Sequence, residues 1–147
     1  MSAVVRPAVA EDEPALYQMA SEAAGSPLDR ELFDALFHRG LADPTHRVAL
    51  AFLQGEPAGW GELEIGYTLA ENGLTGTVVQ LYVRPAQREK GVGRALLIHL
   101  AAAARRKGCG RLLANCSRVN MRSRAFLERN GFVLGKAQFE FHLPQGG

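Results

Sequence analysis

Hydrophobic and polar positions repeat along this chain with two different spacings, and their order predicts the fold. Apolar runs rich in β-branched residues and bounded by glycine or proline predict strands, and apolar positions at helical spacing predict amphipathic helices. The predicted strands cover about 4–9, 47–53, 58–69, 78–83, 111–116 and 137–143. The predicted helices cover about 14–24, 29–40, 92–107 and 120–131. Hairpins come first and a strand–helix–strand unit comes later, so the sequence predicts a mixed α/β sheet whose last crossover joins parallel strands.

The junction between the strand at 78–83 and the next helix has the composition of an anion site. Pro85 ends the strand because it has no N–H to donate. Arg88, Gly91 and Gly93 follow, and the glycines let the backbone approach a ligand closely. The first N–H groups of the helix have no intrahelical partner, so together with flanking basic side chains they favour a phosphate or pyrophosphate. A glycine-rich turn that binds nothing is the alternative.

The glycine spacing narrows the choice of phosphate ligand. The chain contains no G-x-x-x-x-G-K-[ST] run, and Leu96 stands where the dinucleotide pattern G-x-G-x-x-G needs its third glycine. The pattern R-x-x-G-x-G remains, formed by Arg88, Gly91 and Gly93 directly between a strand and a helix. This arrangement resembles the acyl-CoA-binding motif of the GCN5-related N-acetyltransferase (GNAT) superfamily.

A second motif near the C-terminus extends the resemblance over essentially the whole chain. The run from Asn120 through Ser123 and Leu127 to Gly131 and Phe132 resembles the GNAT signature N-x-x-A-x-x-L-Y-x-x-x-G-F. The resemblance is to a small bacterial-type member and implies one N-acetyltransferase domain, 1–147. It also implies the α/β (α+β) GNAT fold, a mixed central sheet of about six to seven strands flanked by about four helices.

The resemblance implies an activity and a set of binding residues. In the family, the fourth and fifth strands, here 78–83 and 111–116, splay apart around an acyl-CoA, which implies acetyl-CoA as co-substrate and no metal. The backbone of Leu81 and Val83 would bind the acetyl-pantetheine, and N–H groups of the glycine loop would bind the pyrophosphate. The implied cofactor-binding residues are Leu81, Val83, Arg88, Glu89, Lys90, Gly91, Val92, Gly93, Arg94, Asn120 and Ser123. The implied reaction is direct attack by a primary amine of a small molecule or peptide in a ternary complex.

The catalytic groups are less evident, because the chain departs from the family pattern. Leu127 replaces the tyrosine that usually acts as general acid, and leucine cannot donate a proton. Tyr82, beside the acetyl-binding backbone, is a candidate replacement, and a packed tyrosine is the alternative. Glu62 and Glu64 share one face of their strand, so they could accept a proton, recognise a cationic acceptor, or only be solvated. The missing tyrosine also leaves open a non-catalytic acyl-CoA-binding module.

Charge divides the chain into two halves of opposite sign. Residues 1–83 contain 4 Lys or Arg and 12 Asp or Glu, whereas residues 84–147 contain 13 and 3. A basic half suits a polyanionic cofactor, and an acidic half suits a cationic acceptor. The basic residues are scattered and lack interleaved aromatic residues, which argues against a nucleic-acid partner. No apolar run is long enough to span a membrane, and two cysteines without metal-ligand spacing indicate reduced thiols and a cytoplasmic location.

The chain that follows the second motif is short. It has room for one good strand at 137–143, where many relatives have two strands that form a wall of the acceptor site. A strand from a second copy could complete that wall, which is compatible with a homodimer.

Overall fold

The computed structural model describes residues 2–116, 120–136 and 138–144, which fall into two compact units, before and after the boundary between Asn115 and Cys116. The first unit contains β1 (Val4–Pro7), α1 (Glu13–Ala24), α2 (Arg30–Ala42), β2 (His46–Leu53), β3 (Glu56–Thr68), β4 (Gly73–Val83), α3 (Val92–Arg106) and β5 (Cys109–Ala114). The second unit contains α4 (Met121–Arg129). In the described part of the chain, no helix is long and apolar enough to cross a membrane.

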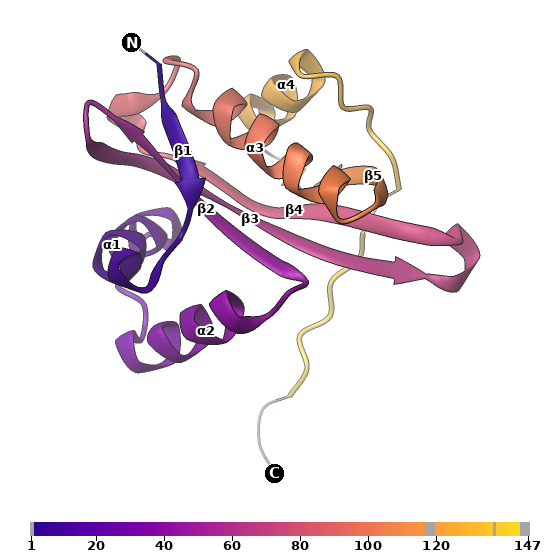
Figure 1. The fold of residues 1–147 in the computed structure, drawn as a ribbon, viewed down its shortest axis with the longest axis horizontal. Helices are drawn as coiled ribbons and strands as arrows, with labels where there is room; N and C mark the ends of the chain where they lie inside the picture. The colour runs from indigo at the N-terminus through magenta and orange to yellow at the C-terminus, as the bar shows by residue number, and fades with distance from the viewer. Residues whose placement is uncertain (1, 117–119, 137, 145–147) are drawn as a thin grey trace. The chain divides into compact units, whose positions relative to one another are not determined.

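The first unit is built on one mixed sheet in the order β1-β2-β3-β4-β5. The first four strands pair antiparallel, and β4 and β5 pair parallel across the α3 crossover, as the sequence predicts. The long β3–β4 hairpin extends beyond the other strands (Figure 1). At its other end, β3 is joined to β2 by a tight turn in which Gln54 and Gly55 both have positive φ, which suits the twist of a hairpin.

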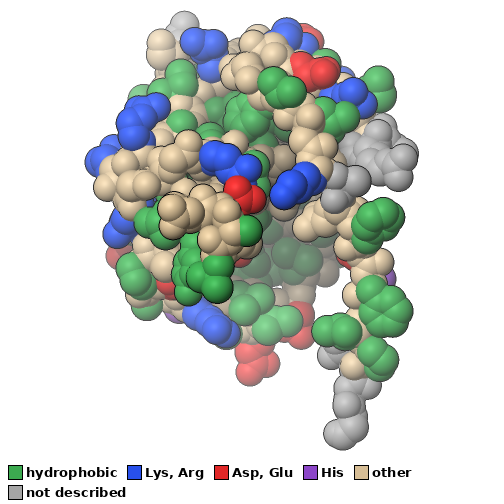
Figure 2. Space-filling model, turned by 90° about the vertical axis from the view of Figure 1, so that its right-hand side faces the viewer, with side chains coloured by type: hydrophobic (Ala, Val, Ile, Leu, Met, Phe, Trp, Pro, Cys, Tyr) green, Lys and Arg blue, Asp and Glu red, His purple; other side chains and the backbone are tan. Residues whose placement is uncertain are grey.

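The predicted number of six to seven strands is wrong, because the described residues form a sheet of 5-stranded order. The predicted last strand, 137–143, is not formed: residues 138–143 have no strand assignment, and Ala137 lies outside the described residues. Phe139, Phe141 and Leu143 alternate along this segment and are 95%, 81% and 76% exposed. Hydrophobic side chains are visible along the extended C-terminal tail (Figure 2). Alternation marks the face that a strand would bury, but a strand also needs a hydrogen-bonded neighbour.

Helices cover both faces of the sheet, α1 and α2 on one side and α3 on the other (Figure 1). On the first side, Met19 of α1 and Phe37 of α2 pack with Leu50 and Trp60 of the sheet. On the second side, the side chain of Leu100 is fully buried against β3. Each face of the sheet is thus packed against apolar side chains of a helix, and the strand ends are left to carry a site.

The second helix shows where a sequence signal misleads. α2 begins next to Asp29, near the predicted start, and Asp29 caps it, because its side chain accepts a hydrogen bond of 3.0 Å from the N–H of Leu32. The predicted end at Gly40 is wrong, since α2 continues to Ala42. A glycine ends a helix by adopting positive φ, and Gly40 does not do so. A Cβ added at Gly40 would lie 3.0 Å from the His46 ring, so this glycine makes room for a side chain of β2.

Asp12 holds the first turn of the chain to β1, and its replacement by Asn is expected to destabilise the protein by about 2 kcal/mol near neutral pH. Its buried carboxylate accepts hydrogen bonds of 2.7 and 2.8 Å from Arg6 and one of 2.8 Å from the N–H of Val9. The Arg6 hydrogen bonds, opposed by burial, hold the pKa of Asp12 below its usual value.

The sign of the pH dependence follows from that lowered pKa. The stabilisation is present above the unfolded-state pKa of about 4 and is lost as the pH falls through the lower folded-state pKa. Denaturant unfolding should therefore separate D12N from the wild type at neutral pH and bring the two together in acid. Asp34→Asn, at an exposed site on α2, should match the wild type. Equal stability of D12N and the wild type at neutral pH would contradict this account.

Candidate active site

The site is built around the C-terminal end of β4, where the sheet opens. The parallel pairing of β4 with β5 ends at Val78 and Ala114, and the N–H of Asn115 donates to the Val78 carbonyl at 3.1 Å. β4 itself continues to Val83. Within residues 2–115, no strand pairs with the β5 side of β4 beyond Val78. A free strand edge of this kind offers a row of backbone donors and acceptors to an extended ligand.

Leu81 and Val83 lie on this free edge. The N–H of Arg84 donates to Ala58 of β3 at 2.9 Å. Because backbone groups alternate in direction along a strand, the N–H and C=O groups of Leu81 and Val83 point away from β3, toward the open side. The Arg88 guanidinium donates from Nε to the Val83 carbonyl at 3.1 Å, so it ties the loop that follows β4 back to the strand end.

The loop after β4 leads into α3 with its first N–H groups free for a ligand. Glu89 and Gly91 have φ of 63° and 83°, and Gly91 is the N-cap of α3 without a side-chain cap. The N–H of Ala95 donates to the Gly91 carbonyl at 3.0 Å in the first helical turn. The N–H groups that precede it have no helical acceptor, and a helix N-terminus flanked by Lys90 and Arg94 suits a phosphate. These residues therefore fit the pyrophosphate that the motif predicts.

Tyr82 points to the other face of the sheet, opposite Leu81. Its hydroxyl donates to Glu22 of α1 at 3.2 Å, and Arg84 contacts the same carboxylate at 3.3 Å. Its ring lies 5.4 Å from the Trp60 ring, centroid to centroid. Burial, followed by the contact with Glu22, raises the pKa of Tyr82. The hydroxyl therefore stays protonated at neutral pH, which is the state that an acid needs.

Glu62 and Glu64 lie on the same face of β3 as Trp60, but in different surroundings. Glu62 is half-buried, and its Oε2 lies 3.0 Å from Nε2 of His46. Trp60 donates from Nε1 to Oε1 of Glu62 at 3.5 Å. Glu64 is exposed and lies opposite His46 in the β2–β3 register. Sequence reasoning missed His46, since only the strand register brings it to the carboxylates.

The predicted residues Asn120 and Ser123, and Leu127 at the usual tyrosine position, belong to the second unit. Asn120 caps α4, since its side chain accepts a hydrogen bond of 3.0 Å from the N–H of Ser123. Leu127 accepts a hydrogen bond of 3.0 Å from the N–H of Phe132, and Gly131 has a φ of 90°. This helix end follows the Schellman pattern.

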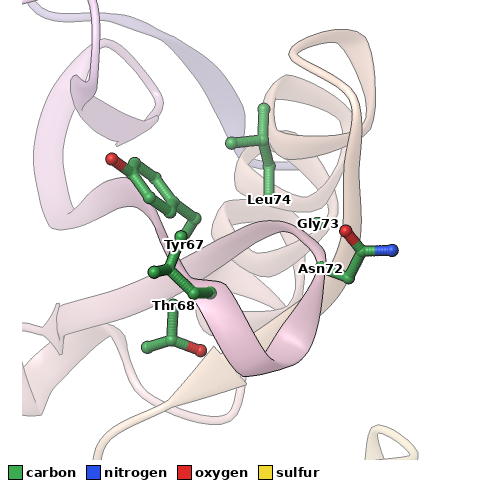
Figure 3. Close-up of a pocket in the computed structure, with 6 residues that line it drawn as sticks. Tyr67, Thr68, Asn72, Gly73 and Leu74 are labelled. Carbon is green, nitrogen blue, oxygen red and sulfur yellow. The ribbon is translucent and has the colours of Figure 1, made fainter.

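An open hollow at the tip of the β3–β4 hairpin lies far from the C-terminal end of β4. Its lining includes Tyr67, Thr68, Asn72 and Leu74 (Figure 3). Leu74 is near the start of β4, and at the usual rise per residue it is roughly 25 Å along the strand from Leu81. The hollow is therefore not part of the site at the C-terminal end of β4.

The chain matches the model of one protein family and a curated relative. Residues 13–132 match the Acetyltransferase (GNAT) family. The aminoalkylphosphonate N-acetyltransferase of Salmonella typhimurium strain LT2 is 30% identical over 104 residues, which cover 71% of this chain and 68% of the relative. Both matches extend well beyond the glycine motif.

Solved structures share the fold. A transcriptional regulator from Bacillus halodurans C-125 has a TM-score of 0.87 at 16% identity, with 97% of this chain and 100% of that chain covered. AAC(6')-Iy in complex with a bisubstrate analogue has a TM-score of 0.86 at 16% identity, with 99% and 100% covered. The same aminoglycoside N-acetyltransferase is also known in complex with CoA. At these identities the likeness shows the fold alone.

Proposed function

We propose that this protein acetylates a primary amine by direct attack in a ternary complex. The premise is that the chain belongs to the acetyltransferase (GNAT) family and is an acetyl-CoA-dependent N-acetyltransferase. The observation that carries the proposal is the free edge of β4 beyond Val78, which leads through a basic loop into the uncapped N-terminus of α3. One continuous stretch of backbone thus offers groups for an extended pantetheine arm and then for a pyrophosphate.

The chain's own residues bind and orient the co-substrate in this proposal. Acetyl-CoA supplies the activated acetyl thioester. The outward N–H groups of Leu81 and Val83 hold the acetyl-pantetheine and stabilise the charge that develops on the carbonyl oxygen. The N–H groups from Glu89 to Arg94 bind the pyrophosphate, and Arg88 keeps the loop against β4. Asn120 and Ser123, in the second unit, are proposed as further cofactor-binding residues.

Two side chains on the face of the sheet that carries Trp60 have the acid–base roles, and a third recognises the acceptor. Glu62 accepts a proton from the acceptor ammonium, and Glu64 attracts a cationic acceptor. Tyr82, protonated at neutral pH, gives a proton to the departing sulfur in place of the tyrosine that Leu127 replaces. The acceptor is an amine of a small molecule or a peptide, and the aminoalkylphosphonate and aminoglycoside acetyltransferases among the similar proteins support an amine-bearing molecule.

Three further proposals concern the protein as a whole. The two units act as one acetyltransferase domain, 1–147, which is supported by a family match that runs across their boundary.

A second copy supplies a strand partner for the exposed alternating segment 138–143, which makes the protein a homodimer. A monomer in size-exclusion chromatography with light scattering would contradict the homodimer. The location is cytoplasmic, which is supported by the reduced thiol of Cys109.

The proposed function is tested by thiol release from acetyl-CoA with a panel of aminoalkylphosphonates, aminoglycosides, polyamines and peptides. A thermal-shift titration with coenzyme A runs beside it. We expect release with one amine class and a rise of the Tm with coenzyme A. A rise without release on any amine would favour a non-catalytic acyl-CoA-binding module, and no rise at millimolar coenzyme A would contradict the cofactor site.

Arg88→Ala is expected to weaken coenzyme A binding about tenfold, because the loop loses the contact with the Val83 carbonyl that holds it to β4. The matched control is Arg105→Ala, which removes the same charge at the other end of α3. R105A should bind coenzyme A like the wild type in the thermal-shift titration. Equal affinity of both variants would show that Arg88 does not shape the site.

A further inference from the structure

His46 stands at the start of β2 and contacts the carboxylate of Glu62. We propose that His46 is a positioning residue of the reaction, which holds Glu62 toward the acceptor and takes up the proton that Glu62 removes. The inference rests on the proposed function, in which Glu62 is the group that meets the ammonium. It assigns a role to a histidine outside both sequence motifs.

Glu62, on β3, lies between His46 of β2 and the strand β4 that carries the proposed cofactor site. In the sheet register Glu62 lies opposite Val48 of β2 on one side and opposite Gln80 of β4 on the other. Its Oε2 lies 3.0 Å from Nε2 of His46, and its Oε1 accepts the longer hydrogen bond of 3.5 Å from Trp60. Trp60 donates to Oε1 in either state of His46, and Nε2 donates to Oε2 when His46 is protonated, so the carboxylate keeps one orientation beside β4.

The imidazole is itself held in place by α2. Gly40 lies over the ring, with a built Cβ only 3.0 Å from Cδ2 and 3.5 Å from Nε2. The His46 side chain is 22% exposed and that of Glu62 is 31% exposed. The pair is therefore partly shielded from water but open enough to exchange a proton with it. A larger residue at position 40 would press on the ring nitrogen that faces Glu62.

The groups around His46 favour its protonated form. From β3 the ring faces Glu62 and Glu64, from the turn after α2 it faces Asp43, and α2 itself contributes Gly40 without a side chain. The guanidinium of the neighbouring Arg47 donates to the His46 carbonyl at 3.1 Å rather than to its ring. The hydrogen bond with Glu62, opposed by burial, raises the pKa of His46 above its ordinary value.

The pair is a better proton acceptor than a carboxylate alone. An isolated Glu has a pKa of about 4.3, too low to hold a proton taken from an ammonium near neutral pH. With neutral His46 behind it, Glu62 passes the proton on, and the pair stores it with the affinity of an imidazole. General bases work best when their pKa lies near the working pH, and imidazole is the side chain whose ordinary pKa lies nearest to neutral.

In the state that reacts, His46 is neutral with its proton on Nδ1, so the lone pair of Nε2 faces Glu62. One proton leaves the acceptor ammonium for a Glu62 oxygen, and a proton moves from Glu62 to Nε2 of His46. The freed nitrogen lone pair forms the N–C bond with the acetyl carbonyl carbon, and the C–S bond breaks with its electron pair on sulfur. The new amide nitrogen loses its extra proton to water, and the sulfur gains one from Tyr82 or water. His46 then returns its proton to solvent, and Tyr82, where it is the donor to sulfur, regains a proton from water.

The test is the pH dependence of kcat/KM for the wild type and His46→Gln, with the acceptor found in the amine panel. The wild type should gain activity as the pH rises through the raised pKa of His46, because the protonated pair cannot accept a proton. In H46Q this rise of activity with pH, the limb of the profile that belongs to His46, should disappear. Its kcat should fall about 100-fold, with little change in KM. The part of the pH dependence that comes from ionisation of the acceptor's own ammonium should remain in every variant. His38→Gln, an exposed histidine of α2, should keep the wild-type profile.

Gly40→Ala keeps every titratable group and provides the second variant. Alanine suits a helix better than glycine, but its methyl group displaces the ring from Glu62. The limb should then move to lower pH, because the contact that raises the His46 pKa is weakened. An NMR titration of the His46 ring gives a readout without turnover: the pKa should fall in both G40A and Glu62→Gln.

The outcomes separate this inference from the proposed function. Turnover by the wild type together with an unchanged profile in H46Q or G40A would overturn the inference and leave the acetyltransferase reaction standing. If H46Q does not fold, the G40A profile and the NMR titration decide. Absence of turnover with every amine would overturn the inference together with the proposed function.

Discussion

Replacing Gly59 by alanine is expected to destabilise the protein by about 3 kcal/mol and to weaken coenzyme A binding. A Cβ at this position of β3 would lie 2.4 Å from the Tyr82 carbonyl oxygen and 3.3 Å from Cα of Val83. Both atoms belong to backbone, which cannot rotate away as a side chain can. The methyl group must therefore push β4 from β3 at the strand end that carries Leu81 and Val83. Denaturant unfolding and a coenzyme A titration measure the two effects.

Gly66→Ala is the matched control, because Gly66 lies on the same strand and a Cβ there meets nothing within 4 Å. Neither glycine has positive φ, so alanine strains the backbone at neither site. G66A should therefore unfold and bind coenzyme A like the wild type. A stable G59A that binds coenzyme A normally would mean that the end of β4 tolerates displacement, and the free-edge site would lose its main support.

Local signals in the sequence were sufficient for most elements. Turn residues such as Gly25 and the Asn72-Gly73 pair, and the Asn120 cap, act through their own backbone or a neighbour a few positions away, so a single sequence reveals them. The glycine loop before α3 is local in the same way, which is why its position and its free N–H groups were predictable. The family match supports the fold that these signals imply.

Long-range pairing was less predictable. The segment 138–143 has the alternation of a strand, but no neighbour pairs with it among the described residues, and alternation cannot report that. Gly40 looks like a helix end, yet its space is occupied by the His46 ring of the next strand. The contact of His46 with Glu62 depends on the β2–β3 register, which brings together residues that are sixteen positions apart in the sequence. The proposed proton acceptors, which are brought together across strands, are therefore the part of the site that the sequence conceals.

Glu62→Gln is expected to lower kcat about 100-fold, because glutamine keeps the size of the side chain but cannot accept a proton. The amide can still accept the hydrogen bond from Trp60 and face His46, so the strand and the binding of coenzyme A should be preserved. Steady-state kinetics at saturating acetyl-CoA measure kcat, and the thermal-shift titration checks the cofactor site. The remaining rate comes from holding the amine beside the polarised thioester.

The matched control is Glu56→Gln, at the exposed start of the same strand, which should have the kinetics of the wild type. Glu64→Gln distinguishes attraction from proton transfer: since Glu64 is exposed, its loss should raise KM for a cationic acceptor and leave kcat nearly unchanged. A wild-type kcat in E62Q would remove Glu62 as the proton acceptor. A large fall of kcat in E64Q would instead move that role to Glu64, which lies opposite His46 in the register. The two carboxylates share one face of β3, so only their contacts with His46 and Trp60 separate their roles, and these substitutions test that separation directly.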